Sequence, residues 1–104
     1  MRASKPSRYL IGTNIKYYSL LDQQMFFEWA QRISSIKQCY LSEQTIYIEL
    51  KSRKLSKRDL YDLLAFLHQY KINMKQLRPF LTKRNQKLFA ADKKAYWYNP
   101  LFGK

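Results

Sequence analysis

The apolar residues of this chain follow two different periods, and this restricts the possible folds more than any other feature. In the segment 60–67, leucines stand at positions i, i+3, i+4 and i+7, which is the stripe that an α-helix buries along one side. In the segment 45–50, Ile46, Ile48 and Leu50 alternate with more polar residues, as in a strand with one buried face. The chain must therefore pack helices against a sheet.

The N-terminal part of the chain predicts a strand and then a helix. The strand is expected over 9–18, where β-branched and aromatic residues alternate with others. The helix begins at Ser19 or Asp22, whose side chains can accept hydrogen bonds from the first-turn amides, and it ends at about 32–34. Phe27 lies off its apolar stripe, so we expect that ring to be exposed. The stripe itself consists of Met25, Phe26, Trp29, Ala30 and Ile33.

The rest of the chain predicts a hairpin followed by helices. The link 41–44 is short enough to join two antiparallel strands, and the leucine-striped helix is expected over 56–70. A short helix over 73–81 should kink or restart at Pro79, and Thr82 should cap one or two further turns. The order β-α-β-β-α-α predicts a two-layer α+β domain, with helices on one face of a small, mostly antiparallel sheet.

Length and composition indicate a single domain. With 104 residues, of which 46% are hydrophobic and 16% aromatic, the chain has enough apolar material for one core. Residues 1–8 hold three basic residues and almost nothing to bury, so we expect a flexible basic arm before one globular domain over 9–104. The aromatic tail 95–102 is too apolar to remain in water, and we expect it to dock on the domain.

Positive charge is concentrated in the second half of the chain. The net charge is +13, and residues 51–104 hold 14 Lys and Arg against 3 Asp and Glu, with no acidic residue between Leu63 and Ala91. A polyanion or an acidic partner would relieve the repulsion in such a stretch. We therefore expect a binding surface whose main contacts are Lys71, Lys75, Arg78, Lys83, Arg84 and Lys87, extended by Arg53, Lys54, Lys57 and Arg58.

Spacing and residue type refine this binding surface. Lys71, Lys75 and Arg78 stand at i, i+4 and i+7 and would share one face of a continuous helix. Tyr47 joins the candidates because it stands on the polar side of its strand, where a ring can stack on an unpaired base. The arm, the cluster near 51–58 and the later cluster form one surface only if packing brings them together.

Groups suited to catalysis are few. His68 is the only histidine and Cys39 the only cysteine, so neither a multi-histidine metal site nor a paired-cysteine zinc site can form. A catalytic pair of these two is a weaker hypothesis than a buried strand cysteine and a histidine favoured by its helix end. Asp59, three residues before Asp62, is better explained as a helix cap. We expect no cofactor and no enzymatic activity.

Cysteine content and hydropathy bear on location. A single cysteine cannot form an internal disulfide, and the first residues lack the layout of a signal peptide. The longest apolar run, Leu63–Leu67, is far shorter than the ~20 residues of a membrane-spanning helix. These features predict a cytoplasmic protein that is not integral to a membrane.

The run LLAFLHQYKINMKQLRPFL, followed by AYWYNPLFG, resembles the C-terminal half of a group of small, single-domain bacterial proteins without an assigned function. The resemblance covers about residues 60–103. It implies a compact bacterial domain and no particular activity.

Two functions of different classes remain open. The first is binding of RNA or DNA through the phosphate backbone, which predicts strongly salt-dependent affinity. The second is an immunity or antitoxin type of protein that blocks an acidic toxin or effector domain, with the basic surface steering association. Attachment to anionic lipid is weaker, because neither long helix pairs a basic face with a surplus apolar one.

Overall fold

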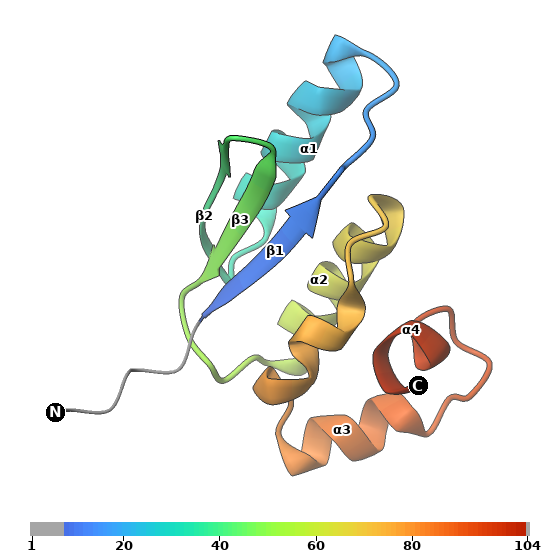
Figure 1. Ribbon diagram of the computed structural model, residues 1–104. Coiled ribbons are helices and arrows are strands. Elements are labelled where there is room, and N and C mark those ends of the chain that lie inside the picture. The colour runs from blue at the N-terminus through green and yellow to red at the C-terminus, as the bar shows by residue number, and fades with distance from the viewer. Residues whose placement is uncertain (1–7, 104) are drawn as a thin grey trace, which may run out of the picture.

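A three-stranded antiparallel sheet forms one layer of the protein. The computed structural model describes residues 8–103, so the expected basic arm lies, apart from Arg8, outside the described residues. The strands are β1 (Tyr9–Thr13), β2 (Ile36–Ser42) and β3 (Thr45–Leu50), in the order β1-β3-β2 (Figure 1). The central strand β3 thus pairs with both neighbours, which makes β1 and β2 parallel to each other, as in a split β-α-β unit.

Helices form the second layer, and the expected α+β architecture is confirmed. Figure 1 shows α1 and α2 against one face of the sheet, with α3 and α4 beyond α2. No helix within residues 8–103 combines the length and apolarity needed to cross a membrane. The helical elements are α1 (Leu20–Arg32), α2 (Lys57–Gln69), the 3-10 helix η1 (Met74–Phe80), α3 (Lys83–Ala90) and α4 (Tyr98–Phe102).

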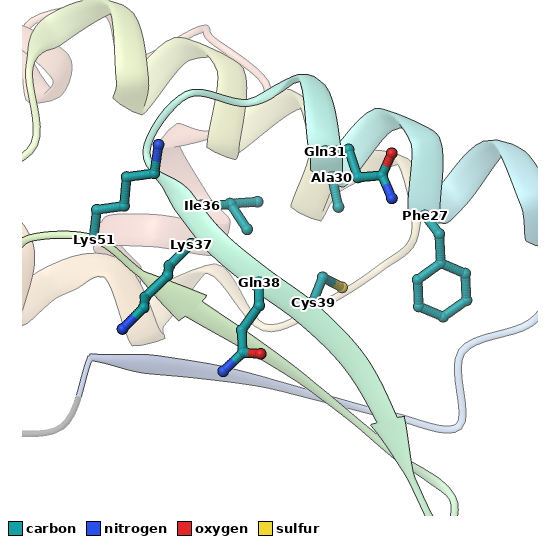
Figure 2. Close-up of a pocket in the computed structure, with 8 residues that line it drawn as sticks. All are labelled: Phe27, Ala30, Gln31, Ile36, Lys37, Gln38, Cys39 and Lys51. Carbon is teal, nitrogen blue, oxygen red and sulfur yellow. The ribbon is translucent and has the colours of Figure 1, made fainter.

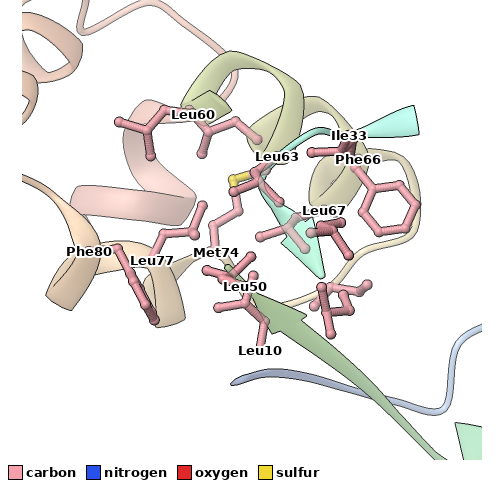
Figure 3. Close-up of a cluster of buried hydrophobic side chains, with 14 of the residues drawn as sticks. Leu10, Ile33, Leu50, Leu60, Leu63, Phe66, Leu67, Met74, Leu77 and Phe80 are labelled. Atoms are coloured by element: carbon pink, nitrogen blue, oxygen red, sulfur yellow. The ribbon is translucent and has the colours of Figure 1, made fainter. Parts of the chain in front are cut away.

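The core lies between the sheet and α2, where the two sequence periods meet. Ile46, Ile48 and Leu50 of β3 are buried, and so are the four leucines of the α2 stripe. Figure 3 shows Leu10 and Leu50, from neighbouring strands, in one cluster with the leucines of α2 and the apolar residues of η1. The alternation in β3 and the leucine spacing in α2 are therefore confirmed as the two sides of one core.

The first strand is shorter than expected. It ends at Thr13 rather than near Tyr18, because Asn14 adopts a left-handed conformation with φ of 54° and turns the chain out of the sheet. The chain then folds back closely, since a Cβ on Gly12 would lie 2.8 Å from Cδ1 of Ile15. Ile15 and Tyr17 consequently pack on the core instead of continuing the strand.

The expectation for two side chains of α1 was wrong. Met25, placed on the buried stripe by its spacing, is exposed, whereas Phe27 is half-buried and lies 5.0 Å from Phe26 between ring centroids. The reason is that α1 also packs along the outer strand β2, so the side of the helix that carries Phe27 faces that strand (Figure 2). Phe26, Ala30 and Ile33 are buried as expected.

The helix caps and the C-terminal tail agree with the sequence. The side chains of Ser19, Ser56, Asn73 and Thr82 each accept a hydrogen bond from a first-turn amide. The segment after Asn73 is a 3-10 helix rather than the expected α-helix with a kink at Pro79. The tail docks on the body through buried Leu101 and through the indole of Trp97, whose Nε1 donates to the Phe89 carbonyl at 2.9 Å.

The core predicts a measurable contrast between two leucines. Leu63→Ala removes a fully buried side chain and should lower the free energy of unfolding by about 2–5 kcal/mol. Leu20→Ala makes the same chemical change at a residue that is 79% exposed, and should change it by less than about 0.5 kcal/mol. Urea unfolding followed by circular dichroism measures both, and equal losses would contradict the assignment of the core.

Candidate functional site

A groove at one end of α2 gathers basic residues that are distant in sequence. It has a volume of about 720 Å³ and lies between the first residues of α2 and one side of α3. Lys57 lines it from α2, while Arg84 and Lys87 line it from α3, and Leu88 and Ala91 contribute apolar surface. We call this surface, defined by these five residues, the basic groove.

Local structure explains why α3 lies beside the start of α2. Asn85 is buried, and its Nδ2 donates to the carbonyl of Leu55 at 2.9 Å, which ties α3 to the connection that precedes α2. Leu55 is itself buried in the core, so this carbonyl is held in place. Arg84 and Lys87, three residues apart, then project from the same side of α3 into the basic groove.

The basic groove carries uncompensated positive charge. Lys57, Arg84 and Lys87 are all exposed, and none forms an ion pair with an acidic side chain in the part of the chain that the structure describes. No acidic residue lines this groove. Both α2 and α3 begin at it, capped by Ser56 and Thr82, so the positive ends of two helix dipoles add to the field. The surface is suited to an extended anion.

Three of the expected contacts lie elsewhere. Lys71 and Lys75 line a separate groove of about 550 Å³ at the far end of α2. Lys71 follows α2 with φ of 57°, and Lys75 belongs to η1, so the expected common helical face with Arg78 is not formed. The guanidinium of Arg78 instead donates to the carbonyls of Leu101 and Gly103 and holds the C-terminal tail.

The remaining predicted cations flank the basic groove without lining it. Arg58 and Lys83 are exposed next to lining residues in the sequence, and Lys54 is exposed two residues before the lining residue Ser56. Arg53 is half-buried, with its guanidinium carbon 4.7 Å from the centroid of the Phe80 ring, so part of its function is structural. The cations predicted from the sequence are thus divided between the basic groove and its surroundings, the separate groove at the far end of α2, and structural contacts such as those that hold the tail.

Tyr47 lies on the face of the sheet opposite the helices, between two tyrosines that the sequence reasoning missed. Its ring centroid is 5.5 Å from that of Tyr40, in a stacked arrangement, and 6.3 Å from that of Tyr9, edge to face. The register places Tyr40 opposite Tyr47 on the neighbouring strand. Pairing the predicted hairpin outward from its turn would have found Tyr40, whereas the position of Tyr9 depends on which strand is central.

The structure does not bring the candidate pair Cys39 and His68 together. Cys39 faces a groove of about 430 Å³ between α1 and β2, near Phe27 (Figure 2). His68 lies near the end of α2, with its ring 4.6 Å from that of Tyr96. Burial raises the pKa of the Cys39 thiol to about 11, which keeps it protonated at neutral pH.

The carboxylate of Asp59 is used in structural hydrogen bonds, as expected for a helix cap. Asp59 forms a reciprocal capping box with Ser56, and its other carboxylate oxygen accepts from Ser34 at 3.2 Å. Over the described range, 8–103, no three His, Cys, Asp or Glu side chains are grouped so that they could hold a metal ion.

Comparisons with known proteins identify no relative of this chain. No family model, no curated protein and no solved structure matches the chain.

The bond that positions α3 can be tested by removing its donor. Asn85→Ala leaves the Leu55 carbonyl buried without this partner, and should lower the free energy of unfolding by about 1–3 kcal/mol. Gln86→Ala, the exposed neighbour on the same helix, should change it by less than about 0.5 kcal/mol. Chemical unfolding of both variants measures the difference, and an unaffected Asn85→Ala protein would show that the bond does not hold α3.

The raised pKa of Cys39 predicts a slow thiol. At pH 8 the folded protein should react with Ellman's reagent at least about tenfold more slowly than the protein unfolded in urea, because the thiolate is scarce and half-buried. Since folding favours the protonated thiol, this contribution to stability is present below pH 9 and is lost as the pH rises through 11. Equal rates in the folded and unfolded protein would contradict the raised pKa.

Proposed function

We propose that the protein is a non-enzymatic nucleic-acid-binding protein whose basic groove contacts the phosphate backbone. The observation that carries this proposal is the convergence of Lys57 with Arg84 and Lys87 in one groove without an acidic lining residue. Charged side chains that serve solubility alone need not converge, and they are usually interspersed with acids. The proposal includes a cytoplasmic, bacterial setting, which the single cysteine and the sequence resemblance favour.

The chemistry of the groove suits a phosphodiester chain. Arg84 can donate two parallel hydrogen bonds to one phosphate, while Lys57 and Lys87 act as point charges for phosphates before and after it. Leu88 and Ala91 offer apolar surface to the sugars between those phosphates. Contacts of this kind position a nucleic acid without reading its sequence, so we expect binding with little sequence preference.

Nearby cations extend the same surface. Lys54, Arg58 and Lys83 lie within two residues of a lining residue in the sequence and are exposed. Lys71 and Lys75, in contrast, lie at the opposite end of α2. The proposal therefore assigns the main contacts to the groove cations and none to the Lys71–Lys75 pair.

The proposal is tested by removing three charges from the groove. The variant K57Q/R84Q/K87Q should bind a short duplex at least about tenfold more weakly than the wild type at low salt. Its plot of log affinity against log salt concentration should also be shallower by about two to three units, because each lost phosphate contact releases one counterion fewer. Fluorescence anisotropy with a labelled oligonucleotide, titrated at several salt concentrations, measures both quantities.

The matched control removes three charges that lie outside the basic groove. K16Q/K71Q/K75Q has the same net charge as the groove variant but leaves the groove intact, so its affinity and salt dependence should stay close to those of the wild type. Equal losses in the two variants would mean that net charge alone attracts the nucleic acid. A wild-type protein that binds no nucleic acid at low ionic strength would refute the proposal.

A second candidate function, binding of an acidic protein such as a toxin domain, is favoured by a different observation. Apolar side chains are exposed at the start of α1, where Tyr18 and Leu20 are 80% and 79% exposed, and Leu21 and Met25 continue the patch. Exposed apolar residues beside a basic body suit a protein partner. Recovery of one stoichiometric acidic protein after nuclease treatment would support this function, and loss of every partner on that treatment would count against it.

A further inference from the structure

The face of the sheet that points away from the helices carries an aromatic cluster. Because side chains alternate along a strand, Tyr9 and Ile11 of β1 lie on this face with Tyr47 of β3 and Tyr40 of β2. We call these four residues the tyrosine face. Helices cover the other face only, and Tyr9, Tyr40 and Ile11 are 37%, 38% and 42% exposed.

The three rings hold one another in place. Tyr47 is central, with Tyr40 stacked on it at an interplanar angle of 20° and Tyr9 edge-on at 88°. The pKa of the Tyr9 hydroxyl is raised, first by desolvation and then by a hydrogen bond with Tyr40. Rings fixed in advance lose little conformational entropy when a flat ligand stacks on them.

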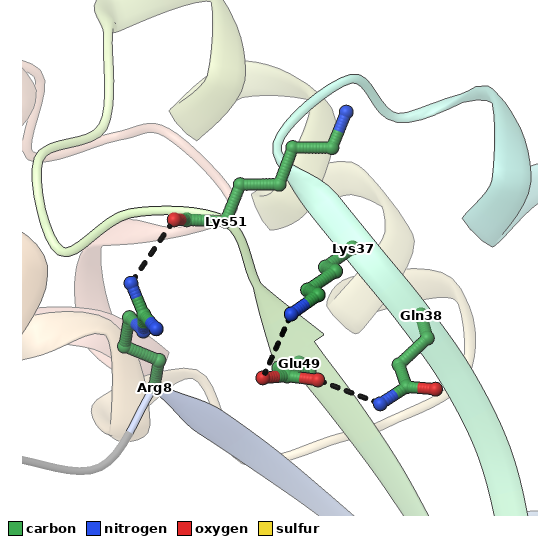
Figure 4. A network of polar contacts seen from close by, with 5 residues as sticks. All are labelled: Arg8, Lys37, Gln38, Glu49 and Lys51. Carbon is green, nitrogen blue, oxygen red and sulfur yellow. Dashed lines mark hydrogen bonds and ion pairs between the residues drawn. The ribbon is translucent and has the colours of Figure 1, made fainter.

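Cations stand at one end of the tyrosine face. Figure 4 shows Arg8 and Lys37 at this end of the sheet, with Nη1 of Arg8 donating to the Lys51 carbonyl at 3.2 Å, whereas the Lys51 side chain points to the groove beside α1 (Figure 2). The one carboxylate on this part of the face, Glu49, is engaged by Nε2 of Gln38 at 2.6 Å and by Nζ of Lys37 at 4.0 Å. Two positive charges against one negative charge favour an anionic ligand here.

This cationic end also leads toward the basic groove. The connection from Lys51 to Ser56 joins the end of β3 to the start of α2, and Asn85 ties that connection to α3. Figure 1 accordingly shows the end of β3 and the start of α3 at the same end of the molecule. The cationic end of the tyrosine face and the basic groove therefore lie at the same end of the molecule.

The outer edge of the sheet beside β1 is already occupied. Gln76 of η1 bonds the Ile11 backbone through both side-chain atoms, because Oε1 accepts from the amide at 2.7 Å and Nε2 donates to the carbonyl at 2.9 Å. An added protein strand would compete with these bonds on that edge. The structure thus favours a ligand that stacks on side chains over one that pairs with the β1 backbone.

We propose that the tyrosine face binds unpaired bases of single-stranded nucleic acid, with the cations at its end contacting the adjoining phosphates. Aromatic side chains stack on any base, and only a single strand exposes its base faces. Tyr40 is the primary stacking residue, since it lies on the outer strand with Tyr47 on one side of its ring. This inference rests on the proposed function and adds a preference for single strands to it.

The experiment compares single strands with a duplex of the same length. Labelled oligouridine and oligothymidine of about 15 nucleotides, and a 15-base-pair duplex, are titrated with wild type and with Tyr40→Thr, which keeps a β-branched residue in the strand. Tyr40→Thr should weaken binding of both single strands by about tenfold and leave duplex affinity unchanged. Tyr40→Phe, which keeps the ring, should bind as the wild type does. The wild-type affinities for oligouridine and oligothymidine show whether RNA or DNA is preferred.

A matched control and the contrary outcomes complete the test. Tyr18→Thr makes the same change at an exposed tyrosine before α1, and should leave all affinities unchanged. Unchanged single-strand binding by Tyr40→Thr, or an equal loss for the duplex, would overturn the stacking assignment while leaving the groove proposal intact. A wild-type protein that binds neither form would refute both. Dissociation of a homodimer by Tyr40→Thr, without a change in single-strand affinity, would mean that a second copy covers this face.

Discussion

Packing of the α2 leucine stripe is the interaction on which the rest of the structure depends. Leu60, Leu63, Leu64 and Leu67 are all fully buried, and they share one core with the buried residues of the sheet. The other sides of α2 hold the remaining helices, because Phe66 contacts Phe26 of α1 while Tyr61 contacts Phe89 of α3. Because α2 packs against the sheet, α1 and α3, its position determines which side chains of these elements remain exposed.

This packing explains how the positive charge is distributed. At the start of α2, the contact between Tyr61 and Phe89 and the bond from Asn85 to Leu55 bring α3 close, and the basic groove forms there. At the other end, the turn at Lys71 and the 3-10 helix carry their cations away from that groove. Cations that follow one another in the sequence therefore lie at opposite ends of α2 in the structure.

Much of the fold could be predicted because burial imposes a period on the sequence. The alternation in β3, the leucine spacing in α2 and the capping residues located these elements within a few residues. Local pattern failed where a neighbour in space decided the outcome. Packing against β2 buries part of Phe27 and leaves Met25 exposed, and the left-handed turn at Asn14 ends the first strand early.

The sequence by itself determined the α+β class, the excess of positive charge and the placement of Tyr47 on the polar side of its strand. The tertiary structure alone decided which cations meet, because Lys57 approaches Arg84 only when α3 folds back onto the start of α2. It also decided the order β1-β3-β2, which makes β3 central and so gathers three tyrosines from three strands on one face. Periodicity records burial along one element, whereas contacts between distant elements depend on how those elements pack.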